Sequence, residues 1–194
     1  MNDPFHSLQL DPGSRALGVA LGERDRYTHY HSRRVAGISR LIGLACDLGL
    51  AELAALELSA FFHDIGKIGI PDHILLKPDG FTEEEMAVMK HHPVKGEGIV
   101  KELGLEDGDL VARVVRHHHE HFDGGGYPDG LQGEAIPVLS RIISVADSYD
   151  AMTKTRPYHD ARPKTEALDI MFSEAGSKLD PYLVHKIQHL AEVG

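Results

Sequence analysis

The amino-acid sequence predicts an all-α protein, built as a helical bundle around one apolar core. Apolar residues recur at helical spacing in almost every segment, and no convincing alternation of apolar and polar residues indicates a β-strand. Glycines and prolines gather in two irregular stretches, 69–81 and 122–137. Since 42% of the 194 residues are hydrophobic, the chain can bury a substantial core.

The N-terminal half of the chain contains three predicted helices. Apolar spacing over 35–45 predicts the first, which Gly49 closes. The same spacing over 53–61 predicts the second, with Gly66 as its stop. Thr82 and Glu85 form a capping-box pattern, which predicts the start of the third.

Five further helices are predicted in the C-terminal half. Pro93 suits the first turn of one that reaches about residue 103. Apolar spacing predicts another from about residue 110 to His119, and others over 139–152 and around 167–171. Pro181 opens the last. We expect residues 1–23 to be an N-terminal extension or linker and residues 24–194 to form the domain.

Composition excludes several classes of protein. The single cysteine, Cys46, rules out an internal disulfide and favours a reducing cytoplasm. No apolar run is long enough to span a bilayer, and the first ten residues lack the pattern of a signal peptide. The formal charge of −10 argues against broad nucleic-acid binding, but it leaves room for a small anionic ligand held by metal ions.

Histidine and aspartate residues near the ends or flanks of the predicted helices form the candidate site. They are His31, His63, Asp64, His92, His118, His119 and Asp147. Nitrogen and oxygen ligands without a thiolate suit Fe, Mn, Ni or Zn rather than a structural cysteine-type zinc site. Seven ligands exceed what one ion with an open position needs. They suit two ions bridged by one carboxylate, an arrangement that recurs in enzymes that cut phosphodiesters.

Taken singly, most of these histidines have a simpler interpretation as surface residues or satisfied core residues. We assign the other nine of the 14 histidines to that class. The pair His63-Asp64 is different, because it follows the apolar residues 60–62 and is expected to be partly buried. Burial of such a pair costs free energy unless both groups are paired or bind metal.

Two longer motifs carry a resemblance to a known family. The segment from His63 to Asp72, HDIGKIGIPD, resembles the HD motif of the HD metal-phosphohydrolase superfamily. The segment from Phe122 to Leu131, FDGGGYPDGL, resembles the signature of its HD-GYP subfamily. Shorter blocks follow in family order, namely His91-His92-Pro93, His118-His119-Glu120, Arg141 to Asp147, Asp150 to Thr153, Arg156-Pro157-Tyr158 and Leu179-Asp180-Pro181. An HD pair alone is weak, whereas both signatures in this order are specific.

The resemblance, which covers roughly residues 24–190, implies an HD-domain helical bundle with a Gly-rich GYP loop. It also implies a cytoplasmic, metal-dependent phosphodiesterase that hydrolyses cyclic di-GMP to pGpG in bacterial second-messenger signalling, with a second cut to GMP left open. Three alternatives remain. They are a phosphodiesterase for a related cyclic dinucleotide, a general HD nucleotidase, and a non-catalytic sensor or docking module, although none of the seven ligands is lost.

The resemblance further implies residue roles. The seven His and Asp residues match metal ligands, with Asp64 as the bridging carboxylate. Lys67 matches a lysine near the scissile phosphate; its alternative role is that of a helix C-terminal lysine facing the helix dipole. Tyr127 and Arg156 match residues that contact the dinucleotide. In the family the Gly-rich loop also meets partners such as diguanylate cyclase domains.

Two positions depart from the family pattern. Some members hold a third metal through a glutamate that corresponds to Tyr27, so we expect two divalent ions here. Iron or manganese is the first expectation, with nickel or zinc as alternatives. Arginine or lysine often follows the Arg-Pro-Tyr block, whereas this chain has His159. That change puts one phosphate contact in question.

Overall fold

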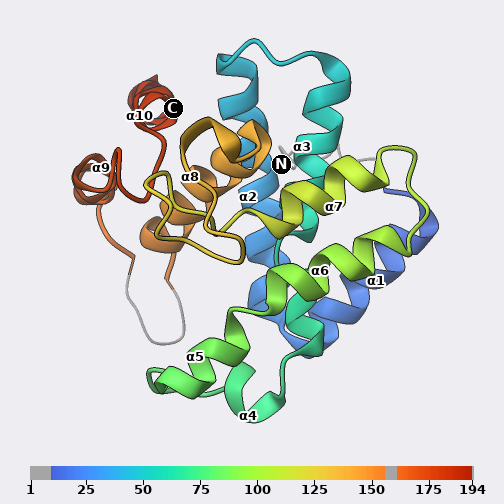
Figure 1. Cartoon of the computed structure of the whole chain (residues 1–194). Coiled ribbons are helices and arrows are strands. Elements are labelled where there is room, and N and C mark those ends of the chain that lie inside the picture. The colour runs from blue at the N-terminus through green and yellow to red at the C-terminus, as the bar shows by residue number, and fades with distance from the viewer. Residues whose placement is uncertain (1–9, 156–160, 194) are drawn as a thin grey trace.

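The computed structural model describes residues 10–155 and 161–193, and within them the predicted all-α fold is confirmed. These residues form ten α-helices and two 3₁₀ helices (Figure 1): α1 Pro12–Arg24, α2 Arg26–Ala45, α3 Leu50–Phe62, η1 Ile65–Gly69, α4 Asp72–Leu75, α5 Glu83–Met89, α6 His92–Lys101, α7 Gly108–Arg116, η2 Gly133–Ala135, α8 Val138–Thr153, α9 Lys164–Ser173 and α10 Pro181–Val193. The described ranges contain no β-strand, only an isolated bridge between Ala175 and Leu179.

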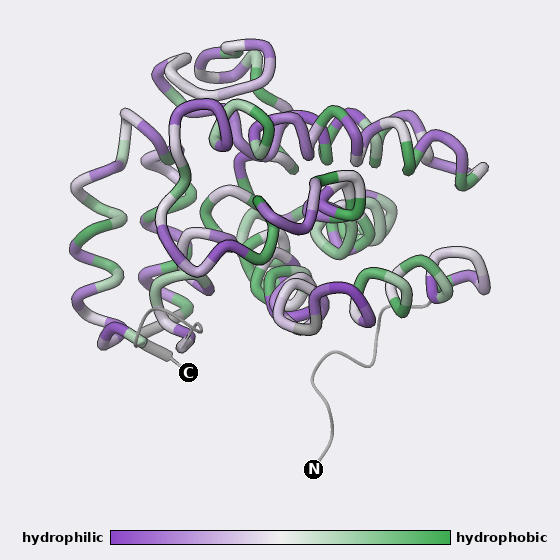
Figure 2. Tube along the Cα trace, turned by 90° about the horizontal axis from the view of Figure 1, so that it is seen from below, coloured by the Kyte–Doolittle hydropathy of each residue, from purple (hydrophilic) through white to green (hydrophobic). Residues whose placement is uncertain are grey.

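The core surrounds α2, which packs against α1, α3, α8 and α10. The larger apolar cluster includes buried Val35, Ile42, Leu56, Ile142 and Ile143. A second cluster lies where α3 meets α7. Apolar and polar residues alternate along the helices in Figure 2, which is the amphipathic pattern that such packing requires. No helix in the described ranges is both long and apolar enough to cross a bilayer.

All eight predicted helices are present, and two more were not predicted. One is α4, which lies inside the stretch 69–81 that was expected to be irregular. The other is α1, whose N-terminus is capped by the Asp11 carboxylate, which accepts from the backbone N–H groups of Gly13 and Ser14. Helix α1 crosses the proposed boundary after residue 23 and buries Leu21 in the second cluster. The division of the chain at this point stays a prediction.

Three predicted helix ends were wrong. Gly49 does not close α2, which ends at Ala45; it is the N-cap of α3. The other two errors lie at the candidate site. Helix α3 ends at Phe62 rather than at Gly66, and α7 ends at Arg116 rather than near His119. After α3 the chain tightens into η1 and passes directly against α6, so closely that a Cβ atom on Gly66 would lie 1.9 Å from the His92 carbonyl oxygen. His63, His118 and His119 therefore lie in turns that follow helices, not within the helices.

Residues 70–90 form a small unit, here called the α4–α5 arm, which projects from the bundle below α6 in Figure 1. Ile70, Ile74 and Met89 form its own apolar core. The predicted capping box at the start of α5 is confirmed. The Thr82 backbone N–H donates to the Glu85 carboxylate at 2.8 Å, and the Glu85 N–H donates to the Thr82 hydroxyl oxygen at 3.3 Å.

Candidate metal centre

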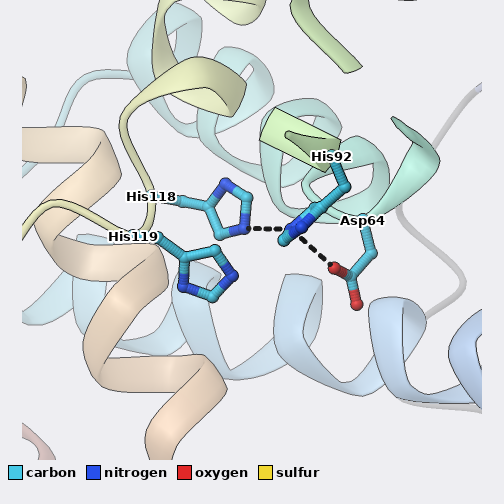
Figure 3. Close-up of side chains that lie close together, drawn as sticks. All are labelled: Asp64, His92, His118 and His119. Carbon is cyan, nitrogen blue, oxygen red and sulfur yellow. Dashed lines mark hydrogen bonds and ion pairs between the residues drawn. The ribbon is translucent and has the colours of Figure 1, made fainter. Parts of the chain in front are cut away.

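The seven predicted ligand residues converge from five parts of the fold. They come from α2, the turn between α3 and η1, the start of α6, the turn after α7, and α8: His31, His63, Asp64, His92, His118, His119 and Asp147. Two groups offer ligand atoms that all lie within 4.8 Å of one another, namely Asp64 with His92, His118 and His119, and Asp64 with His31 and His63. Figure 3 shows the first group. Asp64 belongs to both.

Three of the histidines are oriented by the same local contact. The Nδ1 atoms of His63, His92 and His118 lie 2.6–2.9 Å from the carbonyl oxygens three residues earlier, those of Ala60, Met89 and Val115. Each of these carbonyls lies in the last turn of a helix, where it has no partner within that helix. A carbonyl oxygen can only accept, so each Nδ1 must carry the proton. Each Nε2 therefore presents a lone pair to the centre, as a metal ligand does.

The donor set fits a bound cation. The Nε2 atoms of His92 and His118 face each other at 3.4 Å, although both are acceptors in this tautomer. The buried Nε2 of His63 has no hydrogen-bond partner; it lies 3.3 Å from Asp64 Oδ2, but not in hydrogen-bonding geometry. Buried acceptors that face one another cost free energy unless a cation lies between them. These residues therefore fit a divalent cation.

His31 is held by carboxylates on both of its ring nitrogens. Its Nδ1 lies 2.7 Å from Asp150 Oδ2, and its Nε2 lies 3.0 Å from Asp147 Oδ1. Asp150 is fully buried and also accepts two hydrogen bonds from the Arg34 guanidinium, at 2.7 and 2.9 Å. This chain of contacts fixes the orientation of the His31 ring, in the manner of carboxylates behind histidine ligands of metals.

Asp64 is buried beside cationic and imidazole groups. Burial opposes its ionisation, but the Lys67 ammonium and the neighbouring histidines hold the pKa of its carboxyl well below the usual range. Lys67 Nζ donates to Asp64 Oδ2 at 2.6 Å, and His92 Nε2 lies 3.3 Å from Oδ1. The carboxylate is therefore ionised and has both oxygens directed at cluster residues.

The imidazoles differ in their affinity for protons. Burial lowers the pKa of His31, but Asp147 and Asp150 outweigh it and raise that pKa to about 9. Burial and the neighbouring imidazoles lower the pKa of His118 well below its ordinary value and that of His119 to about 3. His118 and His119 are thus neutral at physiological pH, and the neutral imidazole is the form that binds metal.

A cavity of about 660 Å³ opens onto this cluster. Its lining includes five residues of the cluster, together with Lys67 and Tyr127: His31, Asp64, His92, His119 and Asp147. This volume lies within the range typical of small-ligand sites. The structure thus places Lys67 and Tyr127 beside the cluster, while their contacts with phosphate and dinucleotide stay predictions. Arg156 and His159 lie outside the described residues.

The Gly-rich loop reaches the cluster through Tyr127. Its ring lies 4.9 Å from that of His119, and its backbone N–H donates to the His119 carbonyl at 3.1 Å. Gly126 makes this approach possible, since a Cβ atom there would lie 2.1 Å from the His121 backbone nitrogen. Burial and the carboxylates of Asp64 and Asp147 raise the pKa of the Tyr127 phenol.

Two residues without a predicted role anchor this loop. Buried Glu120 accepts the backbone N–H of Asp129 at 2.7 Å and that of Leu131 at 3.0 Å. Asp129 accepts two hydrogen bonds from Arg116, each at 2.7 Å, and lies 2.8 Å from His117 Nε2. Although His117, Glu120 and Asp129 lie close enough to hold an ion, their atoms are already used in these contacts.

Sequence reasoning placed Glu120 and Asp150 within family blocks but assigned them no role. The available signal was their position: Glu120 directly follows His119, and Asp150 lies three residues after Asp147 on α8.

Tyr27, at the position of the third-metal glutamate, stacks beside His31 with ring centres 5.9 Å apart and planes at 11°. An aromatic ring thus stands at the sequence position where the resemblance implies a glutamate in some family members.

Comparisons with known proteins agree with this geometry. The chain matches the HD domain family over residues 20–183. It is 40% identical over 168 residues to a cyclic di-GMP phosphodiesterase response regulator of Xanthomonas campestris, covering 87% of this chain and 44% of the relative. It is 37% identical over 178 residues to a 3′3′-cGAMP-specific phosphodiesterase of Vibrio cholerae, covering 92% and 38% respectively. The chain thus spans less than half the length of these relatives.

Structural comparison gives the same fold. A solved HD-GYP-type protein of Bdellovibrio bacteriovorus superposes with a TM-score of 0.69 at 21% identity, covering 92% of this chain and 57% of that structure. The family match, the convergent His and Asp residues and the Tyr127 loop together lead to one conclusion. The chain belongs to the HD domain family.

Proposed function

We propose that this chain is the catalytic domain of a phosphodiesterase that hydrolyses cyclic di-GMP to linear pGpG, using two divalent ions. The observation that carries the proposal is the pair of overlapping ligand groups that share Asp64. A single ion would leave part of this buried donor set without a partner. Iron or manganese remains our first expectation, and Tyr27 beside His31 supports two ions rather than three.

The chain's own residues have separate tasks in this reaction. Divalent ions in this donor set would activate water for attack on phosphorus and offset the charge that develops on the phosphate. Lys67 lines the same cavity, and its ammonium is positioned by Asp64 to donate to a non-bridging phosphate oxygen. Hydrolysis adds hydroxide to phosphorus and a proton to the leaving 3′ oxygen, which opens the ring to pGpG.

The choice of cyclic di-GMP as substrate rests on the names of the relatives. The same names make 3′3′-cGAMP a second candidate substrate. Some relatives are named as cyclic di-GMP phosphodiesterases and others as specific for 3′3′-cGAMP. The two substrates share the phosphodiester ring and differ in one purine. We rank cyclic di-GMP first because relatives named for it reach 40–42% identity, against 37% or less for those named for cGAMP.

The test combines metal analysis with chromatography of the nucleotide products. Purified protein, loaded separately with iron and with manganese, is incubated with cyclic di-GMP, 3′3′-cGAMP and pGpG. We expect two metal ions per chain and pGpG as the first product. Turnover of added pGpG would establish the second cut to GMP. Intact cyclic di-GMP after prolonged incubation of the two-metal protein would overturn the proposal in favour of a binding module.

Lys67→Ala separates the chemical step from metal binding. Lysine is not a ligand here, so the variant should keep its metal content while turnover falls by about 10²-fold, as for loss of one charge-stabilising donor. Lys77→Ala is a matched control, because Lys77 lines the same cavity but pairs with Glu85 at 2.5 Å. Loss of metal from Lys67→Ala would contradict the role given to this residue.

Two further predictions extend the proposed function beyond the site. Diguanylate cyclase domains are the predicted partners of the Gly-rich loop, and co-purification with and without the Gly124→Pro change would test this.

A cytoplasmic location stays a prediction from the single cysteine, Cys46.

A further inference from the structure

The cavity at the metal centre is lined by both polar and apolar side chains. Among the described residues that line it, the aliphatic and phenyl side chains all come from the α4–α5 arm: Leu75, Leu76, Phe81, Met86 and Met89. We call these five residues the apolar wall. The metal ligands come from other elements, so the arm adds a surface of different chemistry to the same cavity.

Two residues of the apolar wall are exposed although they are large and hydrophobic. Leu76 is 56% exposed and Met86 39% exposed, whereas Met89 is buried and Leu75 and Phe81 pack against the core of the arm. Exposed apolar side chains that line a cavity are typical of a ligand surface. Methionine suits such a surface because its thioether is flexible and polarisable.

The charges on this side of the cavity do not favour phosphate. Lys77, the lysine of the arm that lines the cavity, lies 2.5 Å from the Glu85 carboxylate, so its charge is locally balanced. Lys90, also on the arm, lies over the Tyr127 ring at 5.3 Å from its centre. Phosphate is better bound beside Lys67 and the ligand cluster, which leaves the apolar wall for an uncharged part of the substrate.

We infer that the apolar wall is a nucleobase subsite, in which one purine of the substrate packs against Leu76 and Met86. This inference rests on the proposed function for the position of the phosphate, at the ligand cluster. It adds a base contact on the side of the cavity formed by the arm, in addition to the contacts expected from Tyr127 and Arg156. A purine has a flat apolar face, and packing that face on these side chains removes apolar surface from water.

Binding of two phosphate ligands by manganese-loaded protein tests the subsite. Guanosine 5′-monophosphate and ribose 5-phosphate share the sugar phosphate, and only the first carries a base. We expect GMP to bind more tightly in calorimetric titrations. Leu76→Ser and Met86→Ser should each weaken GMP binding about fivefold, the scale for partial burial of one such side chain, and should leave ribose 5-phosphate binding unchanged.

Val88→Ser is the matched control for Met86→Ser. Both residues lie on α5 and are almost equally exposed, at 38% and 39%, but only Met86 lines the cavity. The control should bind GMP like the unchanged protein. Equal binding of GMP and ribose 5-phosphate, unchanged GMP binding by both wall variants, or an equal loss in Val88→Ser would overturn the inference.

The outcomes also separate this inference from the proposed function. If cyclic di-GMP is hydrolysed but GMP has no advantage over ribose 5-phosphate, the subsite is wrong and the phosphodiesterase proposal stands. If cyclic di-GMP is not hydrolysed while GMP is preferred and the wall variants lose that preference, the subsite stands and the catalytic proposal is wrong.

Discussion

The histidine cluster and the Gly-rich loop lie against each other, yet they are held in different ways. In the cluster, His63, His92 and His118 are each oriented by a carbonyl only three residues earlier. In the loop, the Tyr127 backbone N–H donates to the His119 carbonyl, and the residues that follow are held by the Glu120 carboxylate through the N–H groups of Asp129 and Leu131. Changes in the cluster should therefore affect metal binding and chemistry, whereas changes at the loop anchor should affect substrate binding.

The largest effect is expected from the residue shared by both ligand groups. Asp64→Ala removes a buried carboxylate that faces His63, His92 and Lys67. Hydrolysis of cyclic di-GMP should fall to background and metal content should drop, because the remaining imidazoles would face cations with less neutralising charge. Metal analysis, product chromatography and circular dichroism measure the three quantities.

Asp79→Ala is the control for this experiment, since Asp79 is exposed in a turn of the arm. It should retain full metal content and activity. A folded Asp64→Ala protein with full activity would remove the two-metal mechanism. A lower melting temperature with normal turnover per folded molecule would assign Asp64 a structural role only.

A smaller effect within the cluster is expected from Asp150→Asn. The change removes the negative charge behind His31 and weakens the hold of Arg34, while the shape of the side chain is retained. Metal affinity should fall by about 10–100-fold, the usual scale for residues that orient a ligand. Titration with metal should restore activity at high concentration, and Asp169→Asn, an exposed change on α9, should behave like the unchanged protein. Failure of excess metal to restore activity would contradict this role.

At the loop, Glu120→Gln should change substrate binding more than chemistry. The amide nitrogen of glutamine cannot accept a hydrogen bond, so one of the N–H groups of Asp129 and Leu131 loses its partner. The free energy of unfolding should fall by roughly 1–3 kcal/mol. We expect KM to rise about fivefold, with kcat and metal content nearly unchanged, since the lost contact positions the loop and touches no ligand.

Glu134→Gln provides the comparison, because Glu134 is an exposed carboxylate of the same loop. It should leave KM and stability unchanged. Loss of metal in Glu120→Gln would show that the loop anchor and the cluster are one unit, against the distinction drawn above.

The smallest effect is a pH dependence of the loop anchor. Hydrogen bonds from Arg116 are the largest influence on Asp129 and lower the pKa of its carboxyl; His117 adds to the effect. A depressed pKa adds stability at neutral pH, and this is lost as pH falls below the ordinary aspartate value of about 3.9. Because Asp129 is at the surface, Asp129→Asn should lower Tm by only roughly 1–3 °C at pH 7.

Thermal unfolding across pH checks this sign. The difference between Asp129→Asn and the unchanged protein should shrink as pH falls below about 3.9, because the carboxyl of the unfolded chain takes up a proton there while that of the folded protein, with its lowered pKa, stays ionised. A difference that grows toward low pH would show that the ion pair does not stabilise the loop.

The sequence by itself determined the fold class and the members of the candidate site. Helical spacing is a local property, and eight predicted helices are present at α2, α3 and α5–α10. His63, His92 and His118 could be identified as candidate ligands because their residue types, order and surrounding motifs can be read from the sequence. Their orientation also depends on local backbone, although the helix ends were misplaced by a few residues.

Tertiary structure alone decided which groups support these residues. His31 and Asp150 lie 119 residues apart in sequence, and their contact exists only because α2 packs against α8. Helix α3 ends where η1 passes close against α6 at Gly66. The apolar wall exists because the α4–α5 arm packs beside the cavity. Residue type and spacing specify what a side chain can bind, but which partner lies within hydrogen-bond distance depends on packing between distant segments.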